Sequence, residues 1–196
     1  MTSKLDDKAL TQIFIDARTH NKWQAKAVPD ALLKDLVDLM KMAPTSANCA
    51  PARIVFVKSH AGKDKLKPFL AAGNIEKTMT APVTAILAYD LAFYDHLPRL
   101  YPHADAKSWF VGKDEHIRTT AMRNGSLQGG YFMLAARALG LDVGGMSGFD
   151  NAALDAAYFS GTAVKSNFLC NLGYGDPSSL HPRSPRFAFD EIAKIV

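Results

Sequence analysis

The sequence predicts a single α+β domain, and three observations point to it. The chain has 196 residues, 48% of them hydrophobic, which is enough for one continuous core. Helical and strand patterns are intermixed along the chain, without the regular alternation of strand and helix that builds a doubly wound parallel sheet. No internal repeat or low-complexity segment breaks this order. We therefore expect residues 1–196 to form one domain.

Two amphipathic helices are predicted at the start of the chain. Apolar residues recur at helical spacing through residues 5–17 and again through residues 28–43. Pro44 should end the second helix, because a proline disfavours helical geometry in the residue before it. We expect a polar loop that exposes hydrogen-bond donors at residues 45–51.

Buried strands are predicted where short apolar segments are rich in branched residues, at residues 54–57 and 83–88. Helical stretches are expected between these strands, at residues 63–72 and 75–80. A further apolar strand is predicted at residues 168–174.

A long helix is predicted at residues 113–139, with Gly140 as a natural C-terminal stop. Gly125, Gly129 and Gly130 lie inside it, and each would cost about 1 kcal/mol relative to alanine if it served no purpose. Close helix packing, including packing across a dimer axis, would explain these glycines.

The remaining segments lie in the C-terminal third of the chain. Residues 142–150 are dense in glycine, and a short helix is expected near residues 151–158. The tail Arg183-Ser184-Pro185-Arg186 then leads into a last short helix.

The charge pattern gives little support for a nucleic-acid or membrane partner. The 23 Lys and Arg residues exceed the 19 Asp and Glu residues by four, and the charges are scattered along the chain. Such an excess can attract an anionic cofactor or substrate, although an ordinary solvated surface accounts for most of it. Residues 1–7 lack the apolar run of a secretory signal, and no segment approaches about 20 uninterrupted apolar residues. We expect a cytoplasmic protein.

The common catalytic and metal-binding motifs are absent from the sequence. There is no GxSxG turn, GxxxxGK[ST] loop, HExxH pair or GxGxxG turn, so hydrolase, kinase and Rossmann dehydrogenase functions lose their usual support. Cys49 and Cys170 are expected to be buried reduced thiols, because no CxxC or Cys/His spacing surrounds them. The six histidines show no pair in ligand spacing with a nearby carboxylate, so no metal is expected.

Three donor-rich segments at the ends of predicted elements remain as candidates for binding. In the first, Arg18 supplies forked charge-assisted donors, while Thr19 and Asn21 supply neutral ones, a combination that suits a phosphate. The same cluster could instead be an ordinary C-terminal helix turn with its cations near the dipole.

The other two candidates follow the second helix and the first strand. One is the loop that contains Pro44, Thr45, Ser46 and Asn48, for which an ordinary turn is the alternative. The other is Asn74 with Lys77. These residues are one helical turn apart, so both side chains can contact one polar edge of a ligand. Asn74 could instead cap a helix, and Lys77 could be a solvated charge.

Together, five pieces in the right order resemble the nitroreductase family of flavoproteins. They are Arg18-Thr19-x-Asn21, Pro44-Thr45-Ser46-x-Asn48-x-x-Pro51, Asn74-x-x-Lys77, Leu139-Gly140-Leu141 followed by Gly145-Met146-Ser147-Gly148-Phe149-Asp150, and the tail from Arg183 to Arg186. No single piece is specific, but the set covers nearly the whole chain. The resemblance implies a nitroreductase-like fold, with a central mixed sheet flanked by helices in an intertwined homodimer.

Within this family the chain is similar to the malonic semialdehyde reductases of bacterial pyrimidine breakdown, on residues 16–21, 44–49, 80–86 and 146–150. This similarity implies an FMN-dependent oxidoreductase that reduces malonic semialdehyde (3-oxopropanoate) to 3-hydroxypropanoate by ping-pong hydride transfer, with NADH or NADPH as co-substrate. A broad nitroaromatic or quinone reductase and a flavin-binding module without turnover remain as alternatives.

The resemblance also implies which residues hold FMN, at a site shared by two subunits. Arg18, Thr19 and Asn21 of one subunit, with Pro44, Thr45, Ser46 and Asn48 of the other, would contact the flavin or its ribityl phosphate. Arg183 and Arg186 lie where a phosphate-binding cation is expected, and the spacing to the last helix favours Arg186.

Two further groups are implied to act on the flavin ring. Asn74 and Lys77 would address its pyrimidine edge, where a cation stabilises the negative charge that builds on reduction. The segment Gly145-Met146-Ser147-Gly148 would run beside N5, because small residues let the backbone come close. The candidate catalytic residues are therefore Lys77 and Ser147, the latter through its backbone, since the family often has glutamate there.

Three positions depart from the family pattern. Asn21 stands where the family has a second arginine, and Ala50 and Ala52 stand where it has glutamine and tryptophan. Either Lys22 or Arg53 also holds the phosphate, or the affinity for the cofactor is modest.

The acceptor is expected to meet residues 93–110, whose aromatic side chains would form a lid over the flavin. The alternative is a peripheral helical pair that completes the core. For an aldehyde acid, Arg53 or an arginine between residues 99 and 123 could fix the carboxylate.

Overall fold

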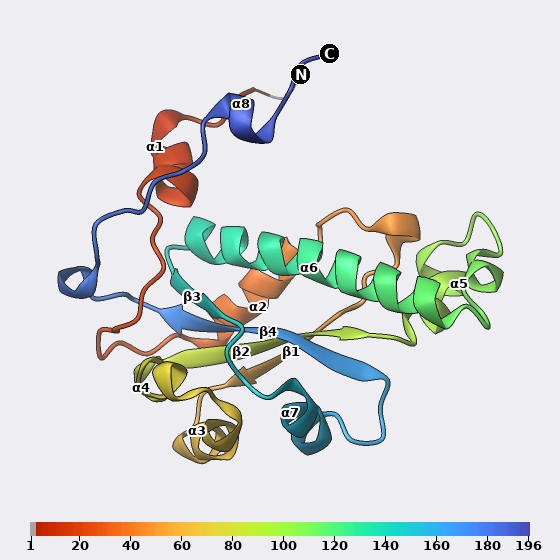
Figure 1. The fold of residues 1–196 in the computed structure, drawn as a ribbon, viewed down its shortest axis with the longest axis horizontal. Coiled ribbons are helices and arrows are strands. Elements are labelled where there is room, and N and C mark those ends of the chain that lie inside the picture. Colours follow the sequence, from red (N-terminus) through yellow and green to blue (C-terminus); the bar gives the residue numbers. More distant parts are fainter. Residues whose placement is uncertain (1–2) are drawn as a thin grey trace.

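A four-stranded sheet in the order β1-β2-β4-β3 forms the centre of the computed structural model, which describes residues 3–196 (Figure 1). The strands are β1 (Ala52–Val57), β2 (Val83–Asp90), β3 (Asp142–Met146) and β4 (Val164–Gly173). Helices flank both faces, so the predicted α+β class and the central sheet flanked by helices are confirmed. Met1 and Thr2, which begin the segment expected to lack a secretory signal, lie outside the described residues.

The four strands pair antiparallel throughout. Strand β2 lies between β1 and β4, and β3 pairs with the other edge of β4. Within residues 3–196, parallel pairing is found only at an isolated bridge between Thr19 and Val143. The mixed character expected of the sheet is therefore limited to this bridge, which joins the segment after the first helix to β3.

Helices cover both faces of the sheet. The helices α2 (Asp30–Met40) and α6 (Asp114–Ala138) lie on one face, and α3 (His60–Leu66), α4 (Ala72–Thr80) and α7 (Asn151–Tyr158) lie on the other (Figure 1). Successive side chains of a strand point to opposite faces, so β2 contributes to two cores. Val83 and Ala85 pack with α2 and α6, whereas Ile86 packs with α3 and α7.

Most predicted helices form close to their expected positions. Helix α2 ends before Pro44, and α7 has the predicted bounds. Helix α3 starts earlier than predicted, because the Ser59 side chain caps it by accepting a hydrogen bond from the Gly62 amide. The α-helix expected over residues 5–17 is wrong in its detail, since only α1 (Asp7–Leu10) is α-helical and a π-helical turn (Thr11–Ile15) follows.

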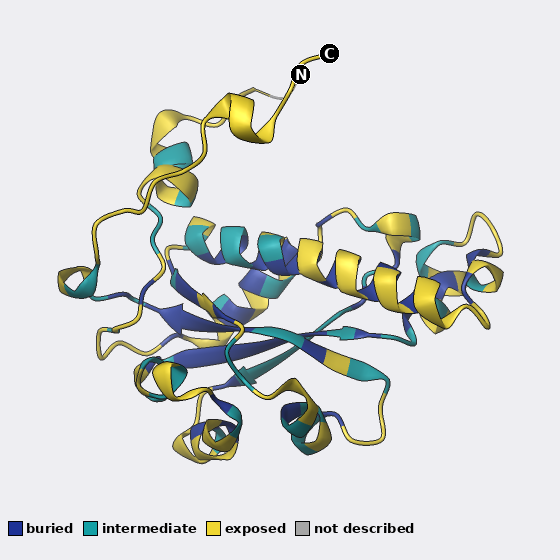
Figure 2. Cartoon of the chain, in the orientation of Figure 1, coloured by how far each residue is buried: buried dark blue, intermediate teal, exposed yellow. Residues whose placement is uncertain are grey.

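The N-terminal helix and the C-terminal tail run side by side away from the sheet (Figure 1). The tail contains α8 (Phe189–Ile192), which is the predicted last short helix. The tail from residue 181 is exposed throughout, whereas the N-terminal helix is partly exposed and partly half-buried (Figure 2). Both segments carry large apolar side chains. Phe14, Phe187 and Ile195 are each more than half exposed.

The glycines of α6 have two different environments. A Cβ atom on Gly125 would lie 2.9 Å from the Cβ of Tyr89, and one on Gly129 would lie 2.7 Å from the ring of Phe168. Close packing therefore explains both residues, as predicted. A Cβ on Gly130 would meet no atom of another part of the described chain within 4 Å.

The glycine-dense segment after α6 forms a strand that the sequence analysis did not assign. Gly140 has a φ of 79°, which permits the sharp stop after α6, and β3 then pairs with β4 from Asp142 to Met146. A Cβ on Gly144 would lie 2.6 Å from the carbonyl oxygen of His20. The glycine thus allows the segment after the first helix to lie against β3.

Residues 91–113 form a small helical layer beside the first half of α6. It contains a 3-10 turn (Phe93–His96), α5 (Leu97–Leu100) and another 3-10 turn (Ala106–Trp109). Phe93 and Phe110 are buried in a core that they share with Ile117 and Cys49. These two aromatic residues therefore complete a core, which agrees with the alternative to the lid. Cys49 and Cys170 are both buried and free, as expected.

Candidate functional site

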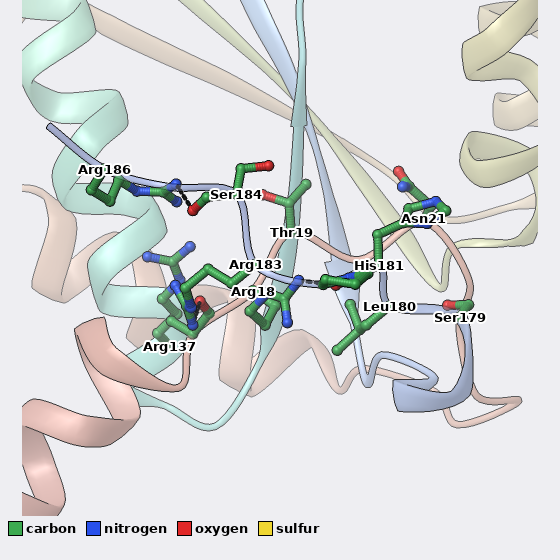
Figure 3. A pocket seen from close by; sticks show the side chains of 12 residues that line it. Arg18, Thr19, Asn21, Arg137, Ser179, Leu180, His181, Arg183, Ser184 and Arg186 are labelled. Atoms are coloured by element: carbon green, nitrogen blue, oxygen red, sulfur yellow. Dashed lines mark hydrogen bonds between the residues drawn. The ribbon is translucent and has the colours of Figure 1, made fainter.

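Five of the predicted cofactor-binding residues line one pocket of about 280 Å³ between the segment after the first helix and the C-terminal tail (Figure 3). Arg18, Thr19 and Asn21 come from the first of these segments, and Arg183 and Arg186 come from the tail. The structure thus brings together residues that lie more than 160 positions apart, since the Arg18 guanidinium donates to the His181 carbonyl.

A fourth arginine in this pocket is Arg137, which the sequence analysis missed. It lies in the last turn of α6. The only sequence signal was a basic residue near a helix C-terminus, which is common and favourable on ordinary grounds. Its position in the pocket follows from packing of the π-helical turn Thr11–Ile15 against α6, where the Gln12 side chain donates to the Arg137 carbonyl at 2.8 Å.

The pocket is strongly positive. No aspartate or glutamate is among its lining residues, and none of its four arginines forms an ion pair within residues 3–196. Their hydrogen bonds go to backbone carbonyls instead, as when Arg183 donates to Ile15 and Ala17 at 2.5 and 3.2 Å. Several guanidinium groups without a carboxylate suit a phosphate, so the pocket fits the phosphate of FMN.

The two other cations suggested for a phosphate have different positions. Lys22 does not line the pocket. Arg53 is held on β1 by Asp90, at 2.7 Å, and by the carbonyl of Ala52, at 2.9 Å. Arg53 does not line the pocket of its own chain either. Its charge is also matched by Asp90, which makes it a poor candidate for a substrate carboxylate.

A second group of predicted residues meets where α4 approaches the end of β3. The Asn74 side chain donates to the carbonyl of Gly148 at 2.7 Å, and the Ala71 amide donates to the same oxygen at 3.0 Å. A Cβ on Gly148 would lie 2.7 Å from the Asn74 Nδ2, so glycine is required for this contact. Of the segment expected to approach a flavin, Gly145 and Ser147 are exposed, Gly148 is half-buried and Met146 is buried.

Lys77 is fixed through its backbone, and its side chain is half-buried. The Lys77 carbonyl accepts hydrogen bonds from the Trp23 indole and from the Asn171 amide, both at 3.1 Å. Its ammonium forms no ion pair in the part of the chain that the structure describes. Lys77 therefore has a fixed backbone and an uncompensated side-chain charge.

A buried lysine, Lys63, anchors the end of α4 next to Lys77. The Lys63 ammonium donates to the Thr78 carbonyl at 2.7 Å and to the Thr84 hydroxyl at 2.5 Å, and Thr84 donates in turn to Asn171 at 2.6 Å. Burial lowers the pKa of Lys63 from 10.5 to about 8. This chain of hydrogen bonds ties α3, the end of α4, β2 and β4 together under Lys77.

The loop at residues 44–51 is held in an unusual backbone conformation. Ala47, Asn48 and Ala50 have φ angles of 50°, 49° and 37°, a region that residues other than glycine rarely adopt. The Ser46 amide donates to the Asn124 side chain at 2.9 Å, which fixes the loop on α6. Pro44, Ser46 and Asn48 are exposed there, and Thr45 is half-buried.

This loop and the arginine pocket are far apart within one chain. The loop contacts α6 at Asn124, whereas the pocket contains Arg137. Thirteen residues of helix, at 1.5 Å each, separate these positions by about 20 Å. The structure therefore does not bring Pro44, Thr45, Ser46 and Asn48 to the pocket of their own chain.

The described residues contain no group of three or more His, Cys, Asp or Glu side chains that could hold a metal ion. Among the same residues, no helix is both long and apolar enough to cross a membrane.

Comparisons with known proteins agree with this geometry. Residues 16–174 match the sequence profile of the nitroreductase family. A Burkholderia lata protein provisionally named as an NADH dehydrogenase/NAD(P)H nitroreductase is 66% identical over 191 residues, which cover 97% of this chain and 98% of that protein.

Two crystal structures share the fold at low sequence identity. One, from Exiguobacterium sibiricum, is of a provisionally named nitroreductase in complex with FMN, with a TM-score of 0.85, 18% identity and complete coverage of both chains. The other, from Staphylococcus epidermidis, is of a provisionally named NAD(P)H:FMN oxidoreductase, with a TM-score of 0.85, 18% identity and coverage of 100% of this chain and 98% of that one. With the match of the family profile to most of its length, the chain belongs to the nitroreductase family.

Proposed function

We propose that the protein is an FMN-dependent NAD(P)H oxidoreductase. The observation that carries this proposal is the pocket with four arginines and no carboxylate, to which a phosphate group can bind. The crystal structure of the relative from Exiguobacterium sibiricum was determined in complex with FMN, and the relative from Burkholderia lata is named for NADH and NAD(P)H. When bound, FMN supplies a redox centre that takes hydride from NADH or NADPH and passes it to a second substrate.

The chain's own residues would bind and orient this group. Arg18, Arg183 and Arg186 neutralise the phosphate, and Thr19 and Asn21 add neutral donors. Lys77 would provide a positive charge for the edge of the ring that becomes negative on reduction, and Asn74 fixes the backbone at Gly148. Gly145 and Ser147 are exposed, and the small residues of this segment would let a flat ring approach the backbone.

We further propose that the active form is an intertwined homodimer with two shared sites. The separation of about 20 Å between Arg137 and Asn124 keeps the loop at residues 44–51 away from the pocket of its own chain. A second copy would bring the two groups together. The outer face of α6 exposes Leu127 and Tyr131 at 49% and 42%, beside Gly130, and the tail exposes several large apolar residues.

For the acceptor, we propose malonic semialdehyde, which would be reduced to 3-hydroxypropanoate. Support comes from the similarity of residues 16–21, 44–49, 80–86 and 146–150 to malonic semialdehyde reductases. A small aldehyde acid needs a cation for its carboxylate, and the arginines between residues 99 and 123 are the remaining candidates. A broad nitroaromatic or quinone reductase is the second candidate, which the names of the relatives favour.

An absorption spectrum tests the cofactor and the reaction together. The purified protein should be yellow and should bleach when NADH or NADPH is added without air. Recovery of the absorbance on adding malonic semialdehyde or a nitroaromatic compound identifies the acceptor class. A colourless protein that takes up no added FMN contradicts the proposal, and a protein that binds FMN but oxidises no NAD(P)H is a flavin-binding module. Because the proposed co-substrates are held inside cells, a cytoplasmic location belongs to the same proposal.

A further inference from the structure

Arg137 has an incomplete set of hydrogen bonds at the wall of the arginine pocket. Its Nε atom is buried and has no hydrogen-bond partner in residues 3–196. Its Nη1 atom reaches the carbonyl of Ile13 only at 3.5 Å, the outer limit for such a bond. The residue as a whole is half-buried and lines the pocket, and its Nη2 atom also forms no hydrogen bond within residues 3–196. The guanidinium therefore keeps donors for a partner that a protein group does not supply.

The groups around Arg137 favour a negatively charged partner. Arg183 lies beside it in the pocket (Figure 3), and burial together with the charge of Arg183 lowers the pKa of Arg137. The carboxylate of Asp142 acts in the opposite sense, but it accepts a hydrogen bond from the Gly175 amide at 2.8 Å and lies 3.4 Å from His20. An anion in the pocket would relieve this repulsion between arginines.

The backbone of Arg137 is fixed independently of any ligand. The Gln12 side chain donates to its carbonyl at 2.8 Å, and the residue lies in the last turn of a helix of 25 residues. Ala135 and Ala136, which precede it, are buried in the main core. The guanidinium is therefore presented from a rigid element, whereas Arg183 and Arg186 come from the exposed tail.

We propose that Arg137 binds the phosphate of FMN. It would supply the positive charge that, in the family pattern, comes from an arginine at position 21. The inference rests on the proposed FMN binding, and it adds a phosphate ligand from α6 to the ligands from the two terminal segments. Asn21 lines the same pocket but carries no charge. Arg137 thus restores the positive charge that Asn21 lacks.

Comparison of FMN with riboflavin tests the proposal, because riboflavin has the same ring without the phosphate. The affinities of the apoprotein for both flavins are measured by fluorescence titration for the wild type, Arg137→Gln and Arg137→Lys. The glutamine variant should bind FMN about tenfold more weakly, with the affinity for riboflavin unchanged. The lysine variant should lose less affinity for FMN than the glutamine variant does, since lysine keeps the positive charge but lacks the paired N–H donors of the guanidinium. Lys67→Gln removes an exposed cation outside the pocket and should leave both affinities unchanged.

The wild-type protein provides a second test that needs no substitution. Phenylglyoxal modifies accessible arginines, and peptide mapping reports the rate at Arg137. Saturating FMN should protect Arg137, whereas saturating riboflavin should not.

The outcomes separate this inference from the proposed function. If Arg137→Gln binds FMN as tightly as the wild type does, the inference is overturned. If the variant loses affinity for FMN and for riboflavin equally, Arg137 has a structural role and the inference is overturned as well. Equal labelling of Arg137 with FMN and riboflavin bound overturns it as well. If the wild type binds no FMN, the proposed function fails together with the inference.

Discussion

The indole of Trp23 donates a hydrogen bond of 3.1 Å to the backbone carbonyl of Lys77. This contact joins two parts of the candidate site that are distant in sequence. Trp23 follows the segment that carries Arg18 and Asn21, and Lys77 lies on α4 with Asn74. The position of the arginine pocket relative to the Lys77 charge therefore depends on it.

Trp23→Phe should weaken FMN binding by a few-fold and lower the free energy of unfolding by about 1 kcal/mol. The loss is limited because the Asn171 amide also donates to the Lys77 carbonyl and keeps it satisfied. Urea unfolding and fluorescence titration measure the two quantities. Unchanged FMN affinity in a destabilised variant would show that the contact serves the fold alone.

Arg18→Ala should weaken FMN binding by about ten- to hundredfold, the range for losing a charge-assisted hydrogen bond to a phosphate. The matched control is Lys8→Ala, which removes an exposed cation from α1 outside the pocket. Equilibrium dialysis against FMN gives both dissociation constants. Equal affinities in the two variants would remove Arg18 from the site.

Lys63 should make the stability depend on pH in a definite direction. Its pKa in the folded protein is about 8, below its ordinary value of 10.5, so the unfolded chain binds more protons between these values. The contribution of Lys63 to stability therefore rises as the pH increases from about 8 to about 10.5. Urea unfolding at several pH values should show the wild type gaining stability relative to Lys63→Met over this range. A constant difference between the two proteins would contradict a lowered pKa.

Gly129→Ala should destabilise the protein by about 1–3 kcal/mol, although alanine is the better helix former. The added methyl group would lie 2.7 Å from the ring of Phe168. Gly73→Ala on α4 is the control, because no atom lies within 4 Å of the added Cβ. Thermal unfolding should show a lower Tm for the first variant and an equal or higher Tm for the second.

Leu127→Glu should shift the proposed dimer towards monomers and reduce FMN binding with it. Leu127 lies on the outer face of α6 and is 49% exposed in one chain, so its replacement leaves the core of that chain intact. Ala156→Glu places the same charge on α7, across the sheet, and should leave association unchanged. Sedimentation velocity with and without FMN measures both effects. A Leu127→Glu protein that stays dimeric would exclude this face from the interface.

The sequence predicted those elements whose signals are local. Helix α6 follows from its apolar spacing and from Gly140, whose positive φ ends it, and α7 follows from Asp150, which caps it by accepting from the Ala153 amide. Strand β3 was not assigned because its glycines have low strand propensity. Its pairing with β4 depends instead on long-range contacts, including the close approach of the His20 carbonyl to Gly144.

The residues of the candidate site also divide into those with a local sequence signal and those without one. Arg18, Asn74 and Lys77 lie in short segments whose composition suggests binding, so they could be found from the sequence. Arg137 could not, because a single arginine within a helical pattern gives no sign of the pocket that the segment after the first helix and the tail form beside it. The left-handed conformation of Ala47 and Ala50 was also hidden, since alanine rarely adopts it.

The exposed tail has a practical consequence for handling the protein. Cleavage by a protease just after Pro182 would remove Arg183 and Arg186, yet it would leave the sheet and its covering helices untouched. Such clipped material should give a normal circular dichroism spectrum while retaining little flavin. The ratio of visible to ultraviolet absorbance, checked beside an intact-mass measurement, would therefore reveal degradation that a test of folding overlooks.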